Sequence, residues 1–600
     1  MPVYNAPVRD TLFILDHVLH LDRHADLEGF SAIDADMVEA ILNEGGRFCS
    51  EVIQPTNQPG DHHGCTRHAD GSVTTPPGFK QAYDQLVEGG WITLTGPVEH
   101  GGQGLPHVLG TAFEEYLVSA NHAFAMYQGL TSGAIAALMA KGSAEQQAIW
   151  VPRLVSGQWT GTMNLTEPQC GTDLGLIRTR AEIQADGSYL ITGNKMFISA
   201  GEHDLAENIV HLVLARTPGS PETAKGLSLF IVPKFLLDDA GQPGERNAVQ
   251  CGSIEEKMGI HGNATCVMNY DGARGWIVGE ENQGLAAMFI MMNMARLGVG
   301  LQGVALAEVA YQNAAAYARD RRQGRALTGR ADPDARADPI IVHPDVRRML
   351  MEAKAFTEGG RALCLWGALL VDLSHHAPTA EEREQADALV SLLTPVIKGY
   401  LTDKGFETTV SAQQIFGGHG YVAEWGMEQF VRDARIPMLY EGANGIQAMD
   451  LVGRKLPKDG GAAIRHFFEI IGQECEAAGK SDDAVVSTLA SRLQKASGEL
   501  QQASLWLMQN GVASPDNAGA AAYAYMHALG IVAMGLMWLR MAVAARAALD
   551  EGAGDKAFYE AKLITARFFG ERQLPDVGAL RRKIEGGAEA IMALPAAAFG

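Results

Sequence analysis

The spacing of apolar residues changes twice along this chain, and these changes limit the folds that it can adopt. Up to about residue 160 the apolar residues recur mainly at helical spacing, as Leu12 and Leu15 do. From about 161 to 280 the pattern becomes strand-like, with Gly- and Pro-containing breaks, and helical spacing then returns. The pattern therefore predicts a mainly α protein with a small antiparallel β domain at its centre. Strands are predicted at 189–193, 209–215 and 227–232.

Breaks in the pattern divide the chain into five predicted domains. A Gly-, Arg- and Asp-rich insert at 328–339 interrupts the later helices and is expected to be an exposed loop. A Pro- and Gly-containing stretch near residue 456 precedes Ala-rich helical segments that extend toward the end of the chain. The predicted domains are an N-terminal helical extension (1–34), a helical domain (35–160), the β domain (161–280), a helical bundle (281–455) and an additional helical domain (456–600).

Charge and cysteine usage exclude several classes of protein. The net charge of −22 argues against a nucleic-acid or anionic-membrane binder. The seven cysteines lack paired spacing and no secretory signal is visible, so we expect a cytoplasmic protein. The apolar stretch Ala528–Leu539 is too short to span a bilayer and is interpreted as a buried helix, without stable membrane insertion. The cluster of Asp61, His62, His63 and Cys65 is interpreted as a turn-rich loop, so we expect no metal site.

The segment Pro437–Gln447 places one carboxylate, Glu441, directly before Gly442 and between two apolar runs. A carboxylate in this position can be partly desolvated and can act as a general base near neutral pH. By itself the pattern is more typical of a helix N-terminus or a solvated carboxylate. Its meaning therefore depends on motifs elsewhere in the chain.

Four further motifs offer groups that suit a flat ligand bearing phosphates. Leu165–Asp173 (LTEPQCGTD) is a turn rich in hydroxyls, and Lys195–Gly201 (KMFISAG) puts an aromatic at a strand end. Tyr317–Arg325 carries an Arg cluster that suits pyrophosphate oxygens. Gln414–Tyr421 (QIFGGHGY) has glycines that let a backbone approach a ligand closely. Taken singly, these motifs are an ordinary turn, a strand end, a solvated face and a loop.

Together, in this order and at these spacings, the motifs resemble the acyl-CoA dehydrogenases over residues 35–455. The N-terminal sequence YNAPVRD and the helical tail are similar to a longer bacterial subgroup of that family. The resemblance implies a helical N-terminal domain, a β-barrel-like middle domain and a helical-bundle C-terminal domain, here followed by an appended helical domain.

The resemblance also implies FAD as cofactor. Some positions would hold the FAD of a neighbouring subunit, so we expect a homodimer. Four positions depart from the usual family residues: Phe197 replaces Trp, Ala443 replaces Thr, Gly445 replaces Gln, and the Phe before Gly324 is missing. The implied FAD contacts are Met163, Leu165, Thr166, Gly171, Thr172, Phe197, Ile198, Ser199, Arg321, Gln323, His343, Pro344, Gln414, Gly417, Gly418, Ala443 and Gly445.

The segment Asn293–Arg296 matches a substrate-binding segment of the family, with Arg296 facing the CoA portion. In one branch of the family the catalytic carboxylate stands one residue before this Arg. Here that position is Ala295, so Glu441 is the implied base. The implied substrate contacts are Thr172, Asn293, Arg296, Tyr440 and Gly442.

The implied reaction is α,β-dehydrogenation of an acyl-CoA to a trans-2-enoyl-CoA, with Glu441 removing the α-proton and a hydride passing to flavin N5. The acyl group would be 3-(methylthio)propanoyl or a medium or long fatty acyl chain, and an electron-transfer flavoprotein would accept the electrons. Two alternatives remain open. One is an acyl-CoA oxidase that reduces dioxygen, and the other is a non-catalytic acyl-CoA-binding or scaffold protein.

Overall fold

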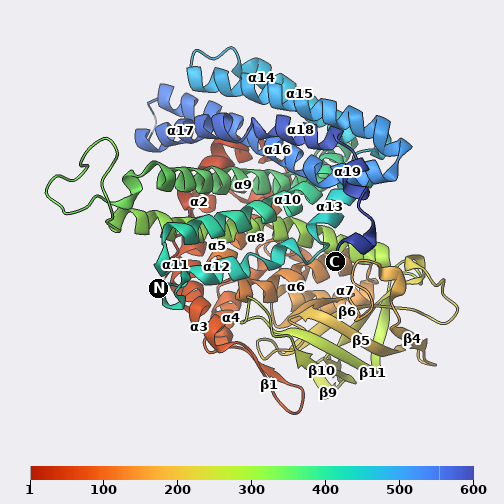
Figure 1. Ribbon diagram of the computed structural model, residues 1–600. Helices are drawn as coiled ribbons and strands as arrows, with labels where there is room; N and C mark the ends of the chain where they lie inside the picture. The colour runs from red at the N-terminus through yellow and green to blue at the C-terminus, as the bar shows by residue number, and fades with distance from the viewer. Residues whose placement is uncertain (1, 553) are drawn as a thin grey trace. The chain divides into compact units, whose positions relative to one another are not determined.

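A computed structural model describes residues 2–552 and 554–600 of the protein (Figure 1). The chain forms two compact units. Residues 44–298 are here called the sheet unit, and residues 1–43 with 299–600 the helical unit. Helices α2 (Ala35–Phe48) and α8 (Gly284–Asp320) each run across a boundary between these two parts of the sequence.

The sheet unit contains a seven-stranded sheet with strand order β3-β6-β7-β11-β5-β4, in which β10 also pairs with β11. Strands β3 and β6 run parallel, whereas the other pairings in this sheet are antiparallel. The predicted central β domain is thus confirmed, with one parallel pair that the sequence did not indicate. The strands are β3 (Trp159–Asn164), β4 (Arg180–Ile183), β5 (Tyr189–Ser199), β6 (Asn208–Ala215), β7 (Ser228–Pro233), β10 (Val249–Ile254) and β11 (Thr265–Val278). Short hairpins pair β1 (Thr66–Arg67) with β2 (Val73–Thr74) and β8 (Phe235–Leu237) with β9 (Pro243–Arg246).

Strand β6 is buried on both faces. Leu212 and Leu214 belong to one apolar cluster, which includes residues of the helices α6 and α7. Val213 and Ala215 belong to a second cluster within the β domain. The sequence of a strand with two buried faces is a continuous apolar run, because neither set of alternate side chains is exposed to water. The helices of this unit are α3 (Asn57–His63), α4 (Phe79–Glu88), α5 (His107–Ala120), α6 (His122–Lys141) and α7 (Ala144–Val155).

Two long helices, α9 (Pro344–His376) and α10 (Ala380–Ile415), form the centre of the helical unit (Figure 1). The turn between them ends in a capping box, in which Thr379 and Glu382 satisfy backbone groups at the start of α10. Three short helices follow, and the predicted catalytic segment lies between the last two of them and runs into the last one. They are α11 (Gly418–Tyr421), α12 (Met427–Asp433) and α13 (Asn444–Asp450).

Some of the appended helices pack directly onto α9 and α10 within the helical unit, and the others pack against the appended helices themselves. They are α14 (Ala462–Ala478), α15 (Ala484–Ala513), α16 (Pro515–Asp550), α17 (Lys556–Arg572), α18 (Asp576–Glu585) and α19 (Glu589–Met592). Three helices in the described residues, α6, α8 and α16, are long and apolar enough to cross a membrane by length and composition. The sequence argument that Ala528–Leu539 is too short was therefore wrong, since this segment is part of a 36-residue helix. However, 89% of the most apolar window of α16 is buried in the protein, as expected for a buried helix.

The N-terminal extension is joined to the helical unit by buried charges. Asp10 of α1 (Val8–Phe13) pairs with Arg361 of α9 and with Lys562 of α17. Lys562 also binds Glu358 at 2.8 Å, and Arg361 binds Glu308 of α8 at 2.9 Å. Burial by itself would raise the pKa of the Asp10 carboxyl, but the two cations lower it below its ordinary value. These ion pairs connect the first residues of the chain with the appended helices.

Candidate functional site

Glu441 lies in a tight turn that leads into α13. Glu441 and Gly442 both have positive φ, at 56° and 87°. This left-handed conformation costs roughly 1–2 kcal/mol for a residue with a Cβ atom. A Cβ on Gly442 would also lie 2.7 Å from Nε2 of Gln447. The turn therefore requires glycine at 442 and holds Glu441 in a strained conformation.

Two buried side chains hold the carbonyl groups of this turn. Gln447 Nε2 donates to the carbonyl oxygens of Glu441 at 2.9 Å and Gly442 at 3.3 Å. Lys398 of α10 donates from Nζ to the Gly442 carbonyl oxygen at 2.9 Å and to Asn444 Oδ1 at 2.7 Å. Ala443 occupies the cap position of α13 and forms no side-chain capping bond. Side chains of α10 and α13 thus fix the backbone beside the carboxylate.

The residue before the carboxylate connects this turn to α8. The hydroxyl of Tyr440 donates to Gln302, which lies in the part of α8 that belongs to the helical unit. Tyr440, Glu441 and Gly442 are all half-buried. A partly desolvated carboxylate on a fixed backbone can act as a general base near neutral pH.

The predicted FAD contacts near the ends of α8 and α10 also lie in the helical unit. Arg321 and Gln323 are exposed. His343 lies next to Gln323, with its Nε2 atom 2.8 Å from the Gln323 carbonyl oxygen. Pro344 follows His343 and begins α9. Tyr317 stacks on Phe416 with ring centroids 4.1 Å apart, which brings the end of α8 next to the end of α10.

The glycines at the end of α10 leave their backbone accessible. A Cβ built on Gly417 or Gly418 would meet no atom within 4 Å, and Gln414 before them is exposed. Along α10, Gln414 lies 16 residues from Lys398, or roughly 24 Å at 1.5 Å per residue. The structure thus places the Gln414 group and the Glu441 turn far apart on one helix, so they are two separate groups of predicted site residues.

In the sheet unit, the turn after β3 is fixed against the end of β5. The backbone N–H of Met196 donates to the Thr166 carbonyl oxygen at 2.9 Å. Lys195 Nζ donates to the Leu165 carbonyl oxygen and pairs with Glu167, both at 2.9 Å. The structure therefore brings two of the predicted flavin-binding motifs together. These motifs contain Met163, Leu165, Thr166, Gly171 and Thr172 in the first and Phe197, Ile198 and Ser199 in the second.

Glu167 is a structural carboxylate of this turn. Burial would raise the pKa of its carboxyl, but the Lys195 ammonium and the Thr179 hydroxyl lower it to about 2. Glu167 also accepts hydrogen bonds from the backbone N–H groups of Arg178 and Thr179. An ionised carboxylate with all these partners supports the loop and is unsuited to take up a proton near neutral pH.

Phe197 at the end of β5 is 56% exposed and has a φ of 58°. An aromatic residue rarely adopts this conformation, and strained residues cluster at ligand sites. Gly171 and Thr172 in the adjoining turn are exposed as well. A flat ring system therefore fits this surface, with an aromatic face, hydroxyls and backbone groups available to it. The residues present suit the predicted flavin.

The predicted substrate segment lies on the part of α8 in the sheet unit. Asn293 is exposed, whereas Arg296 is buried and donates to Asn293 Oδ1 at 3.3 Å. Met288 and Met291 of the same helix are fully buried in the core cluster that includes Leu165. Adaptable thioether side chains commonly fill such cores, so these methionines have a packing role.

Sequence reasoning did not identify Glu114 of α5 as an unusual carboxylate. Burial raises the pKa of its carboxyl to about 7. A Cβ on Gly298, two residues after Arg296, would lie 2.9 Å from Glu114 Oε1. The sequence gives no signal for this residue, because its burial depends on the close approach of α8 at a glycine.

Comparisons with known proteins agree with this arrangement. Four family models match: "Acyl-CoA dehydrogenase, N-terminal domain" (38–158), "middle domain" (162–273) and "C-terminal domain" (282–456), and "Acetyl-CoA dehydrogenase C-terminal like" (467–595). A 3-methylmercaptopropionyl-CoA dehydrogenase of Ruegeria pomeroyi is 45% identical over 97% of this chain and 98% of its own length. The broad-specificity linear acyl-CoA dehydrogenase FadE5 of Mycobacterium tuberculosis is 37% identical over the full length of both chains.

A solved structure shows the same fold. It is an acyl-CoA dehydrogenase complexed with FAD from Bacillus anthracis, with a TM-score of 0.74 and 20% identity. The match covers 94% of this chain and 90% of that one. The predicted fold class is therefore confirmed.

Proposed function

The chain belongs to the acyl-CoA dehydrogenase family, and on this basis we propose that Glu441 is its catalytic base. Members of this family are oxidoreductases that bind FAD and act on acyl-CoA thioesters. The observation that carries the proposal is the Glu441 turn, in which Glu441 is half-buried with a strained backbone, and Gln447 and Lys398 bind the carbonyl groups of the turn.

The carboxylate of Glu441 would remove a proton from the α-carbon of the thioester. Bound FAD supplies the two-electron acceptor for the hydride that leaves the β-carbon, and the product is a trans-2-enoyl-CoA. The backbone N–H of Glu441 would donate to the thioester carbonyl oxygen, where negative charge develops. One such donor is typically worth about 3–4 kcal/mol in the transition state. The strained turn would keep this N–H and the carboxylate in a fixed relation.

The FAD would be held by two sets of residues. In the sheet unit, the turn at 165–172 and the Phe197 strand end would contact the flavin ring. In the helical unit, Arg321 would donate to phosphate oxygens of the FAD of a neighbouring subunit, and the open glycines at 417 and 418 would let the backbone approach that cofactor. Arg296 and Asn293 would bind the CoA portion of the substrate.

We further propose 3-(methylthio)propanoyl-CoA as the first substrate to test, followed by linear acyl-CoAs. The relative with 45% identity is named for the former and FadE5 for the latter. An electron-transfer flavoprotein is the proposed electron acceptor, and a cytoplasmic homodimer is the proposed state. Release of hydrogen peroxide under air at the rate of turnover would instead identify an oxidase, and mass measurement in solution tests the dimer.

The test is anaerobic bleaching of the bound flavin by a panel of acyl-CoAs. Glu441→Gln should retain FAD and reduce the flavin more slowly by roughly 10²–10⁴-fold, the usual contribution of a general base. Glu424→Gln, an exposed carboxylate of the same unit, serves as the control and should bleach at the wild-type rate. Bleaching of Glu441→Gln at the wild-type rate would exclude Glu441 as the base.

A further inference from the structure

A hydrogen-bond network connects the appended helix α16 with the Glu441 turn. We propose that Tyr523 and His527 of α16 are positioning residues for Glu441, so that the appended domain takes part in orienting the catalytic base. This inference rests on the proposed role of Glu441. All the residues concerned lie in the helical unit.

Asp403 of α10 receives the contacts from α16. Its Oδ2 atom accepts from the Tyr523 hydroxyl at 2.5 Å and from His527 Nε2 at 2.9 Å. Its Oδ1 atom accepts from Asn444 Nδ2 at 2.7 Å. Burial would raise the pKa of the Asp403 carboxyl, but the bonds from His527, Tyr523 and Asn444 lower it, so Asp403 accepts as a carboxylate. Hydrogen bonds to a charged acceptor are the stronger kind.

Asn444 carries this arrangement into the catalytic turn. It is the first residue of α13, and its side chain is buried between Asp403 and Lys398. Asn444 Oδ1 accepts from Lys398 Nζ at 2.7 Å, and the same ammonium donates to the Gly442 carbonyl oxygen at 2.9 Å. The path from α16 to the peptide group beside Glu441 thus consists of direct contacts of 2.9 Å or less.

The catalytic turn depends on such support because its conformation is strained. A positive φ at a residue with a Cβ persists only where the surrounding contacts over-determine it. Ala443 at the cap position provides no side-chain acceptor, so Asn444 and Lys398 fix the start of α13. Asn444 Nδ2 also donates to the Gly399 carbonyl oxygen at 3.0 Å and to Thr402 Oγ1 at 2.9 Å. Loss of the contacts to Asp403 would therefore loosen Asn444 without freeing it, and would relax the turn in part. The base would then lose its orientation toward the substrate.

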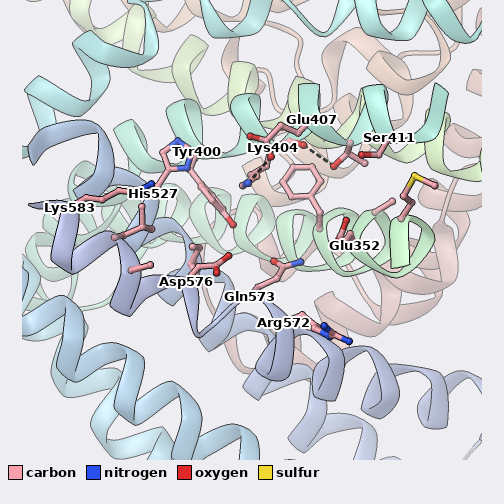
Figure 2. A pocket seen from close by; sticks show the side chains of 17 residues that line it. Glu352, Tyr400, Lys404, Glu407, Ser411, His527, Arg572, Gln573, Asp576 and Lys583 are labelled. Atoms are coloured by element: carbon pink, nitrogen blue, oxygen red, sulfur yellow. Dashed lines mark hydrogen bonds and ion pairs between the residues drawn. The ribbon is translucent and has the colours of Figure 1, made fainter. Parts of the chain in front are cut away.

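His527 also lies at the edge of a cavity of about 480 Å³ in the helical unit, next to Tyr400 (Figure 2). Lys404 of α10 and Asp576 and Lys583 of α18 line the same cavity. The rings of His527 and Tyr400 meet edge to face, with centroids 5.4 Å apart. Because one side of the imidazole borders open space, the bond to Asp403 contributes strongly to the orientation of His527.

The chain offers a matched control on the same helix. Tyr525 shares a hydrogen bond of 2.7 Å with Ser504 of α15, entirely within the appended helices. Tyr523→Phe and Tyr525→Phe each remove one hydroxyl from α16, but only the first removes a contact to Asp403. A purely structural role of α16 predicts similar effects of both changes, or a larger effect of Tyr525→Phe, since Tyr525 is buried and Tyr523 is 49% exposed.

The experiment uses the FAD-loaded full chain and two measurements. Amide hydrogen exchange over residues 439–447 reports the turn directly, and anaerobic flavin reduction reports catalysis. Tyr523→Phe should increase exchange in this segment and lower the maximal reduction rate roughly tenfold, with little change in the acyl-CoA concentration for half-saturation. Tyr525→Phe should change neither. His527→Leu should resemble Tyr523→Phe, whereas His527→Gln should restore much of the rate, because its amide can donate to Asp403.

The outcomes separate this inference from the proposed function. Wild-type exchange over 439–447 in Tyr523→Phe, or equal effects of Tyr523→Phe and Tyr525→Phe, would overturn the role of α16 even if Glu441 is the base. Rapid bleaching of Glu441→Gln would refute the proposed base, and with it the catalytic meaning of the network. An exchange effect of Tyr523→Phe would still establish the coupling of α16 to the turn.

Discussion

Glu114→Gln should make the protein more stable at pH 8 without stabilising it at pH 5. The carboxyl of Glu114 has an ordinary pKa of 4.5, and burial raises it to about 7 in the folded protein. Between these two values the folded state holds a proton that the unfolded state has released. The stability of the wild-type protein therefore falls as the pH rises from about 4.5 to about 7.

The magnitude follows from the difference between the two pKa values. One pKa unit corresponds to about 1.36 kcal/mol, so ionisation of Glu114 costs at most about 3 kcal/mol at pH 8. The half-buried position of the residue means that partial hydration reduces this cost. Glutamine has the same shape and stays neutral. It should therefore be nearly equivalent to the protonated acid at pH 5 and more stable than the ionised acid at pH 8.

Urea unfolding of FAD-loaded protein at the two pH values measures this difference. The quantity to compare is the change in unfolding free energy caused by Glu114→Gln at pH 8 minus that at pH 5. A positive difference of about 1–3 kcal/mol is expected. Glu145→Gln, an exposed carboxylate of the same unit, should give a difference near zero. A difference near zero for Glu114→Gln as well would show that this carboxyl ionises without the cost inferred from its burial.

Two further substitutions test the backbone of the Glu441 turn and the buried charges. Gly442→Ala should slow flavin reduction by acyl-CoA and destabilise the protein by about 1–2 kcal/mol, because a Cβ at this left-handed position is strained. An unchanged free energy of unfolding together with an unchanged reduction rate would contradict the strain beside Glu441. Lys562→Met should destabilise by roughly 3–5 kcal/mol, since it leaves the buried Asp10 carboxylate without one of its cations. Thermal unfolding measures this loss, and exposed Lys556→Met on the same helix should show little change; equal midpoints for the two variants would refute the argument.

The order of the elements was predictable because local spacing determines it. The strands at 189–193, 209–215 and 227–232 and the long helices of the second half are confirmed in place. The parallel pairing of β3 with β6 was not predictable, because these two strands are separated by β4 and β5 in the chain. The burial of β6 on both faces likewise depends on which helices cover the sheet.

The candidate site was predictable where a motif carries its own chemistry. The pairing of Gly442 with a carboxylate, the hydroxyl-rich turn at 165–173 and the glycines at 417–418 are all visible as short sequence patterns. Sequence reasoning missed Glu114, whose raised pKa comes from burial alone. It also missed Asp403, Tyr523 and His527, since 120 or more residues separate Asp403 from the other two.

The sequence by itself determined the family, the kind of cofactor and the carboxylate proposed to do the chemistry, because these depend on residue types at short spacing. Only the tertiary structure decided how that carboxylate is held. Packing between distant helices produces the strained turn at Glu441, the contact of the Lys398 ammonium with this turn and the contacts from α16. Short-range pattern carries no information about such contacts, because burial and hydrogen-bond partners exist only once the helices have assembled.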